Sequence, residues 1–145
     1  MADKKTDIEL KRQVEERYMM LQLISGQMQE IQKEIAAMEE KASDVAGLKN
    51  NLKCLAESKA GSKSFSSLGL GTYVESEIKN TETVLVNVGA GVFVKKTAKE
   101  AEEIIGKQIS QLDSINAQLT ENLTMLAARA QELEGELQEL VGAQQ

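Results

Sequence analysis

The sequence predicts an α+β fold: a long antiparallel coiled-coil helical hairpin with two small β-hairpins between its helices. Two observations support this fold class. Apolar residues recur alternately every four and three positions near both ends of the chain, and every second position in its middle. The first spacing is typical of coiled-coil helices and the second of half-buried strands. We therefore divide the chain into an N-terminal coiled-coil helix (1–60), a linker with two β-hairpins (61–97) and a C-terminal coiled-coil helix (98–145).

The N-terminal segment carries a heptad seam with two charged interruptions. We expect its helix to begin at Thr6, because Thr6 and Glu9 have the spacing of a capping box. We expect it to stop between Ser58 and Ser64, with Gly61 as the C-terminal signal. No proline interrupts the segment. The seam consists of Leu10, Val14, Arg17, Leu21, Ile24, Met28, Ile31, Ile35, Met38, Ala42, Val45, Lys49 and Leu52.

The C-terminal segment carries a second seam. Thr97 and Glu100 form another capping-box pair at its start, and Gly142 is expected to end the helix. Two long helices that flank a compact connector pack most readily on each other, folded back antiparallel. The second seam consists of Ile105, Ile109, Leu112, Ile115, Leu119, Leu123, Leu126, Ala130, Leu133, Leu137 and Leu140.

Equal rise along two antiparallel helices predicts which residues lie opposite one another near the chain ends. Val14 should face Val141, and Tyr18 should face Leu137. The apolar residues at these ends outnumber what a two-helix seam requires, and Met19 and Met20 are flexible side chains suited to promiscuous binding. We predict a binding surface made of Ile8, Leu10, Val14, Tyr18, Met19, Met20, Leu137, Leu140 and Val141.

The connector repeats itself. Residues 68–74 (LGLGTYV) correspond to residues 88–94 (VGAGVFV), and residues 79–82 form a polar turn between the two units. Each unit reads as a strand, a Gly-x-Gly turn and a strand. We expect four short strands in a small sheet whose open edges pair with other subunits. The predicted oligomerisation residues are Gly69, Gly71, Val74, Val84, Val86, Val88, Gly89, Gly91, Val92, Phe93 and Val94.

The composition restricts the location and the partners. The chain has 145 residues, of which 3% are aromatic, and its formal net charge of −6 argues against nucleic acid and anionic membranes as partners. No stretch approaches the roughly 20 apolar residues of a membrane span, and the polar start is unlike a signal peptide. The single cysteine, Cys54, cannot form an internal disulfide. We expect a cytoplasmic protein.

The sequence offers little for catalysis. It contains no histidine, so the commonest general base and metal ligand is missing. Cys54 has no histidine to activate it, and we expect it to be a small buried side chain near the end of the first helix. Neither Gly-x-Gly pair is followed by the residues of a phosphate-binding loop. We therefore predict no enzyme activity, no cofactor and no metal site.

With LGLGTYVESEIKNT and VNVGAGVFVKKTAKEA between two coiled-coil helices, the chain resembles the alpha class of the archaeal prefoldin family. The resemblance covers nearly the whole chain, and residues 88–96 are its most specific part. It departs from the family at Ser67, where a proline is common. The resemblance implies an ATP-independent chaperone: two alpha and four beta subunits form a hexamer with a double β-barrel body and coiled-coil arms.

By the same resemblance, the partners are the prefoldin beta subunits, non-native polypeptides gripped at the coiled-coil tips, and a group II chaperonin that receives them. The glycines of the two Gly-x-Gly pairs would shape the hairpins. A different interpretation stays open, in which the chain is a structural coiled-coil scaffold or a filament-forming relative. A closed hexamer satisfies every strand edge, whereas a filament repeats one interface head to tail.

Overall fold

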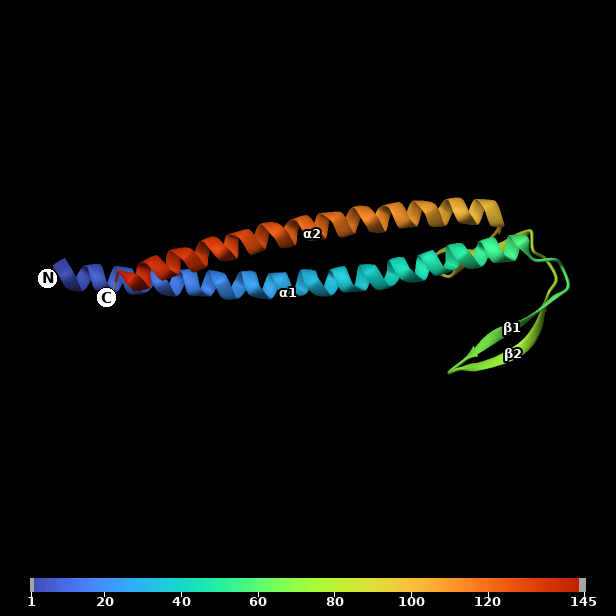
Figure 1. Cartoon of the computed structure of the whole chain (residues 1–145), viewed down its shortest axis with the longest axis horizontal. Helices are drawn as coiled ribbons and strands as arrows, with labels where there is room; N and C mark the ends of the chain where they lie inside the picture. Colours follow the sequence, from blue (N-terminus) through green and yellow to red (C-terminus); the bar gives the residue numbers. More distant parts are fainter. Residues whose placement is uncertain (1, 144–145) are drawn as a thin grey trace. The chain divides into compact units, whose positions relative to one another are not determined.

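The computed structural model describes residues 2–143 and contains two long helices separated in sequence by four strands (Figure 1). This arrangement confirms the predicted fold class. Met1, Gln144 and Gln145, the outer ends of the predicted helical segments, lie outside the described residues. The elements are α1 (Ala2–Glu57), β1 (Ser62–Gly69), β2 (Thr72–Ile78), β3 (Thr83–Gly89), β4 (Val92–Thr97) and α2 (Ala98–Gly142).

The chain forms two compact units. We call residues 1–39 with 114–145 the terminal unit, because it holds both chain ends, and residues 40–113 the connector unit, because it holds the strands. Each unit contains a segment of α1 and a segment of α2. In the terminal unit, higher residue numbers on α1 meet lower numbers on α2: Val14 shares a hollow with Val141, and Ile31 shares one with Asn122. The two helices are therefore antiparallel there, as predicted.

The start of α1 differs from the prediction. The helix begins at Ala2, and Thr6 lies inside it, where its hydroxyl donates to the carbonyl oxygen of Ala2 at 2.8 Å. A threonine hydroxyl can bond either a free amide at a helix start or the carbonyl one turn back, and here it takes the second partner. The capping-box spacing of Thr6 and Glu9 therefore does not mark a helix end.

The end of α1 at Glu57 agrees with the predicted stop. The hydroxyl of Ser58 donates to the carbonyl oxygen of Cys54 at 2.7 Å and so closes the last turn. Gly61 is not the helix terminator. It has φ of +90° and its N–H donates to the carbonyl oxygen of Ile78 at 2.7 Å, so it begins the first hairpin, whose strand β1 starts at Ser62.

The predicted cap of α2 is confirmed. The N–H of Glu100 donates to the hydroxyl oxygen of Thr97 at 3.1 Å, and the N–H of Thr97 donates to a carboxylate oxygen of Glu100 at 3.3 Å. Both partners thereby satisfy amides that have no acceptor within the helix. The other end of α2 is at Gly142, also as predicted.

The seams are confirmed with two exceptions. Lys49 on α1 is exposed, and Ile115 on α2 is 44% exposed, while Asn116 next to it is half-buried. An unbroken alternation of four and three from Ile109 passes through position 116 rather than 115, and the helix geometry follows that alternation rather than side-chain polarity. The side-chain oxygen of Asn116 is buried and has no hydrogen-bond partner among residues 2–143.

The connector unit holds the larger of the two small cores. Leu52 of α1 and Ala101 and Ile105 of α2 are buried together, and Val84 and Val86 of β3 pack against them. The strands form two separate antiparallel hairpins, β1–β2 and β3–β4, rather than the single four-stranded sheet expected. In the terminal unit, the fully buried side chain is Leu133.

The turn between the hairpins is polar, as predicted, and explains their separation. The side-chain oxygen of Asn80 accepts from the N–H groups of Glu82 and Thr83, at 2.8 and 3.3 Å. This turn satisfies the backbone locally, so β3 starts a new pair with β4 instead of continuing from β2.

The cap of α2 can be tested with a matched pair of threonine substitutions. Thr97→Ala removes an acceptor for a free helix amide and should lower the free energy of unfolding by about 1 kcal/mol. Thr6→Ala should leave it unchanged or raise it slightly, because Thr6 is inside a helix and alanine favours helix. Chemical denaturation followed by circular dichroism measures both. Equal effects of the two substitutions would contradict the assignment of the caps.

The polar seam position can be tested at Asn116. Asn116→Leu removes a buried oxygen that lacks a partner and should raise the free energy of unfolding by about 1–3 kcal/mol. Gln118→Leu, on the exposed side of the same helix, controls for helix propensity and should change it little. Thermal unfolding of both variants gives the comparison, and a destabilised Asn116→Leu protein would show that the asparagine has a stabilising contact.

Candidate functional site

The ends of the two helices bring the predicted binding residues together. Val14 and Tyr18 of α1 and Leu137 and Val141 of α2 line one hollow of about 420 Å³ in the terminal unit. The four residues predicted to lie opposite one another thus line the same hollow. Next to it, Nε of Arg17 donates to a carboxylate oxygen of Glu136 at 2.7 Å, with both side chains partly buried. This ion pair explains how a charged residue occupies a seam position.

The nine residues of the predicted binding surface, which we call the end cluster, differ in exposure. Leu10, Val14, Leu137 and Leu140 are half-buried in the seam. Other members project into solvent, including Met19, which is 70% exposed, and Tyr18, Met20 and Ile8, which are also largely exposed. Single exposed apolar residues are ordinary, whereas three consecutive ones, Tyr18, Met19 and Met20, place apolar side chains around much of one helix turn. These side chains can bind other apolar side chains by burial alone, without a chemical reaction.

The two hairpins have the same construction. In each, a bulge precedes the turn, between Ser67 and Gly69 and between Asn87 and Gly89. Gly69 and Gly89 have φ of +103° and +118°, a region that side-chain-bearing residues avoid. The N–H of Gly69 donates to the hydroxyl of Ser67 at 3.3 Å, and that of Gly89 to the amide oxygen of Asn87 at 2.9 Å. Ser67 thus takes the same part as Asn87.

The predicted oligomerisation residues fall into two groups. Val84 and Val86 face the core of this chain, and Val94 is half-buried. The four glycines and Val74, Val88, Val92 and Phe93 are exposed. Sequence reasoning overlooked further exposed apolar residues on both hairpins, although the alternation of the strands could have indicated them. These residues are Phe65, Leu68, Leu70, Tyr73 and Leu85.

The thiol of Cys54 is exposed, so the prediction of a buried side chain was wrong. Its neighbour Leu52 faces the core, and residues two apart on a helix do not share a face. Within residues 2–143, no cluster of cysteine, aspartate or glutamate side chains could hold a metal ion. None of the described helices is long and apolar enough to cross a membrane.

The fold and these surfaces define a class of protein: a coiled-coil hairpin that exposes apolar side chains on two short β-hairpins and at the helix ends. A family model described as prefoldin subunit matches residues 24–143, which is most of the chain. The chain therefore belongs to the prefoldin family of chaperone subunits.

Individual prefoldin subunits that are similar in sequence support this family assignment. The chain is 33% identical to the prefoldin subunit alpha of Methanosarcina mazei over 110 residues, which cover 76% of this chain and 75% of that one. It is 23% identical to the prefoldin subunit alpha of Archaeoglobus fulgidus, over 87% of this chain and 92% of that one. A cryo-EM structure of filamentous prefoldin from Methanocaldococcus jannaschii has the same fold, with a TM-score of 0.72 at 21% identity, covering 79% of this chain and 95% of that one.

The role of the bulge glycines can be tested at Gly89. Gly89→Val places a β-branched side chain at φ +118° and should destabilise the second hairpin by about 1–3 kcal/mol. Ala90→Gly, one residue on, relieves a positive φ of +51° and should have the opposite sign. Hydrogen exchange of residues 83–97, measured by mass spectrometry, should become faster in the first variant and slower in the second. Unchanged exchange in Gly89→Val would show that the turn tolerates a side chain.

Proposed function

We propose that this chain is an alpha-type subunit of an ATP-independent holdase that binds non-native polypeptides at the ends of its helices. It assembles with beta-type subunits into a hexamer of two alpha and four beta subunits, and the complex passes its clients to a group II chaperonin. The observation that carries the proposal is the exposed apolar surface at the helix ends of a prefoldin family member, with Tyr18, Met19 and Met20 projecting into solvent.

The helix ends suit clients of many sequences. Methionine side chains are flexible and polarisable, so they adapt to different apolar partners. Each end offers only a small apolar area, and each contact is therefore weak. Several ends that engage one unfolded chain raise the effective concentration of the next contact, so that holding is firm and still reversible without nucleotide hydrolysis.

The hairpins suit assembly. A two-stranded hairpin alone is marginally stable in water, and each of the two here has unpaired edges. Their exposed apolar residues, such as Phe65, Tyr73 and Phe93, gain burial when hairpins of other subunits pack on them. Closure of several subunits into a barrel would pair the remaining edges.

A second candidate is a filament-forming structural role. It is favoured by the likeness in fold to the filamentous prefoldin of Methanocaldococcus jannaschii. Hairpin edges that pair head to tail without closing would produce an open chain of subunits. Light scattering of this chain mixed with its beta-type subunits across concentrations separates the two assemblies, because a closed hexamer keeps one mass and a filament grows.

The binding role of the helix ends can be tested by truncation. A complex that lacks residues 1–20 and 134–145 of this chain should stay assembled but should suppress aggregation of a heat-denatured client several-fold less, because the whole apolar end cluster is removed. Light scattering at a fixed ratio of complex to client measures the suppression. Full suppression by a truncated complex of unchanged mass would refute the role of the ends.

A gentler variant guards against loss of structure. Tyr18→Gln, Met19→Gln and Met20→Gln together alter only exposed side chains of α1 and keep its length. They should reduce suppression in the same direction as the truncation. Ile115→Gln, an exposed apolar change on α2 outside the end cluster, is the control and should have no effect.

A further inference from the structure

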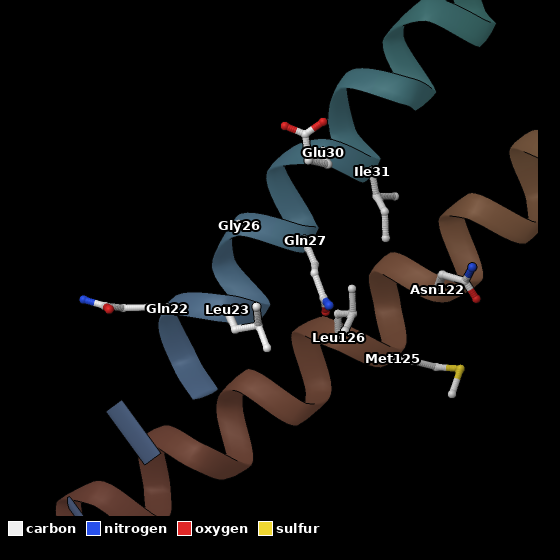
Figure 2. A pocket seen from close by; sticks show the side chains of 9 residues that line it. All are labelled: Gln22, Leu23, Gly26, Gln27, Glu30, Ile31, Asn122, Met125 and Leu126. Carbon is white, nitrogen blue, oxygen red and sulfur yellow. The ribbon is translucent and has the colours of Figure 1, made fainter. Parts of the chain in front are cut away.

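A second apolar hollow lies on the flank of the terminal unit, apart from the end cluster. It has a volume of about 770 Å³ and lies between residues 22–31 of α1 and residues 122–126 of α2. Figure 2 shows the side chains of Leu23 and Gln27 pointing from α1 toward Leu126 on α2. We call this hollow the flank groove. None of its residues belongs to the predicted end cluster.

Two apolar side chains of the flank groove are largely exposed. Leu23 and Met125 are each 64% exposed, and neither belongs to the coiled-coil seam. Gly26 also lines the groove, and among residues 2–143 a Cβ at this position would meet no atom within 4 Å beyond its chain neighbours and the adjacent backbone of its own helix. Glycine inside a helix is unfavourable relative to alanine, so packing within this chain does not explain it. Its absent side chain leaves the groove open.

The polar residues of the groove fit an extended backbone. Gln27 and Asn122 line it with amide groups, which both donate and accept hydrogen bonds. Both side chains are exposed, and neither takes part in a side-chain hydrogen bond found within residues 2–143. A folded partner pairs its own backbone groups internally, whereas a non-native polypeptide carries free N–H and C=O groups. The combination of apolar walls and unpaired amides therefore favours an unfolded segment as the occupant.

The charge of the terminal unit indicates which segments bind best. Residues 1–39 and 114–145 contain 13 acidic and 7 basic side chains, whereas residues 40–113 contain 10 of each. The whole net charge of −6 therefore belongs to the terminal unit. Four of its cations, Arg12, Arg17, Lys33 and Arg129, already contact glutamates. At the groove itself, Glu30 contacts Lys33 at 3.5 Å in a solvent-exposed pair that holds it weakly.

We propose that the flank groove is a second client site, which takes an apolar side chain of an unfolded segment that also carries lysine or arginine. This rests on the proposed holdase function and adds a site and a preference to it. The apolar side chain sits against Leu23, Met125 and Leu126, the amides of Gln27 and Asn122 bond the backbone, and the basic residue faces Glu30 and the acidic terminal unit.

The test uses the assembled complex and two labelled peptides with the same leucine-rich centre, one flanked by lysines and the other by glutamates. Fluorescence anisotropy should give a Kd for the lysine peptide at least about fivefold lower than for the glutamate peptide, and the difference should shrink at high salt. Leu23→Gln with Met125→Gln should raise the Kd for the lysine peptide about fivefold or more, since both walls of the groove lose their apolar surface. Both residues are exposed, so the fold is preserved.

The controls separate the groove from the helix ends. Ile115→Gln should leave the Kd unchanged, and so should Gly47→Gln, which adds a side chain at an open helix glycine of the connector unit. Gly26→Gln adds the same side chain inside the groove and should raise the Kd for the lysine peptide.

Three results would overturn the proposal. One is an unchanged Kd for the lysine peptide in Leu23→Gln with Met125→Gln; another is equal binding of the two peptides by the unaltered complex. The third is a change in the mass of the complex when it carries Leu23→Gln with Met125→Gln, which would identify the groove as a contact between subunits. Failure of the holdase function is distinct, because the unaltered complex would then not suppress client aggregation.

Discussion

The interdigitation of the two heptad seams is the interaction on which the rest of this structure depends. A seam that repeats every 3.5 residues keeps one stripe of each helix against its partner. In the connector unit the seam residues Leu52 and Ile105 also support β3 through Val84 and Val86. In the terminal unit they include Leu133, which is fully buried. Without the seam, neither the hairpins nor the helix ends would have a fixed base.

A two-helix seam is a narrow core, and this limitation creates the binding surfaces. Two helices can bury only the stripes that face each other, so apolar residues elsewhere on them remain in solvent. Met19 and Leu23 are of this kind. In a globular domain such residues would be covered by a third element. Here the exposed apolar side chains are available for partners, and the acidic balance of the terminal unit keeps them in a charged, solvated setting.

The hairpins solve a different problem. Each needs a tight turn whose twist matches its strands, and the bulge glycines Gly69 and Gly89 provide the positive φ that this requires. The positions two residues before them accept the glycine N–H through a serine in one hairpin and an asparagine in the other. The repetition in sequence therefore corresponds to a repetition in backbone conformation, with different side chains performing the same task.

Much of the fold could be predicted from the sequence because the signals are local and periodic. The helical and strand spacings, the cap at Thr97 and Glu100, and the repeated Gly-x-Gly turns depend on residues close in the chain. The opposition of Tyr18 and Leu137 followed from helix rise alone. The proposed end cluster could be predicted from the sequence for the same reason.

Only the tertiary structure decided the features that depend on which way a side chain faces. Cys54 proved exposed and Asn116 half-buried in place of Ile115, because the facing of each is set by the partner helix rather than by its own polarity. The separation of the hairpins depended on the bonds that Asn80 makes. The flank groove joins residues about 100 positions apart, so no local pattern could indicate it. Sequence determines periodicity, and packing determines which face of each period meets a partner.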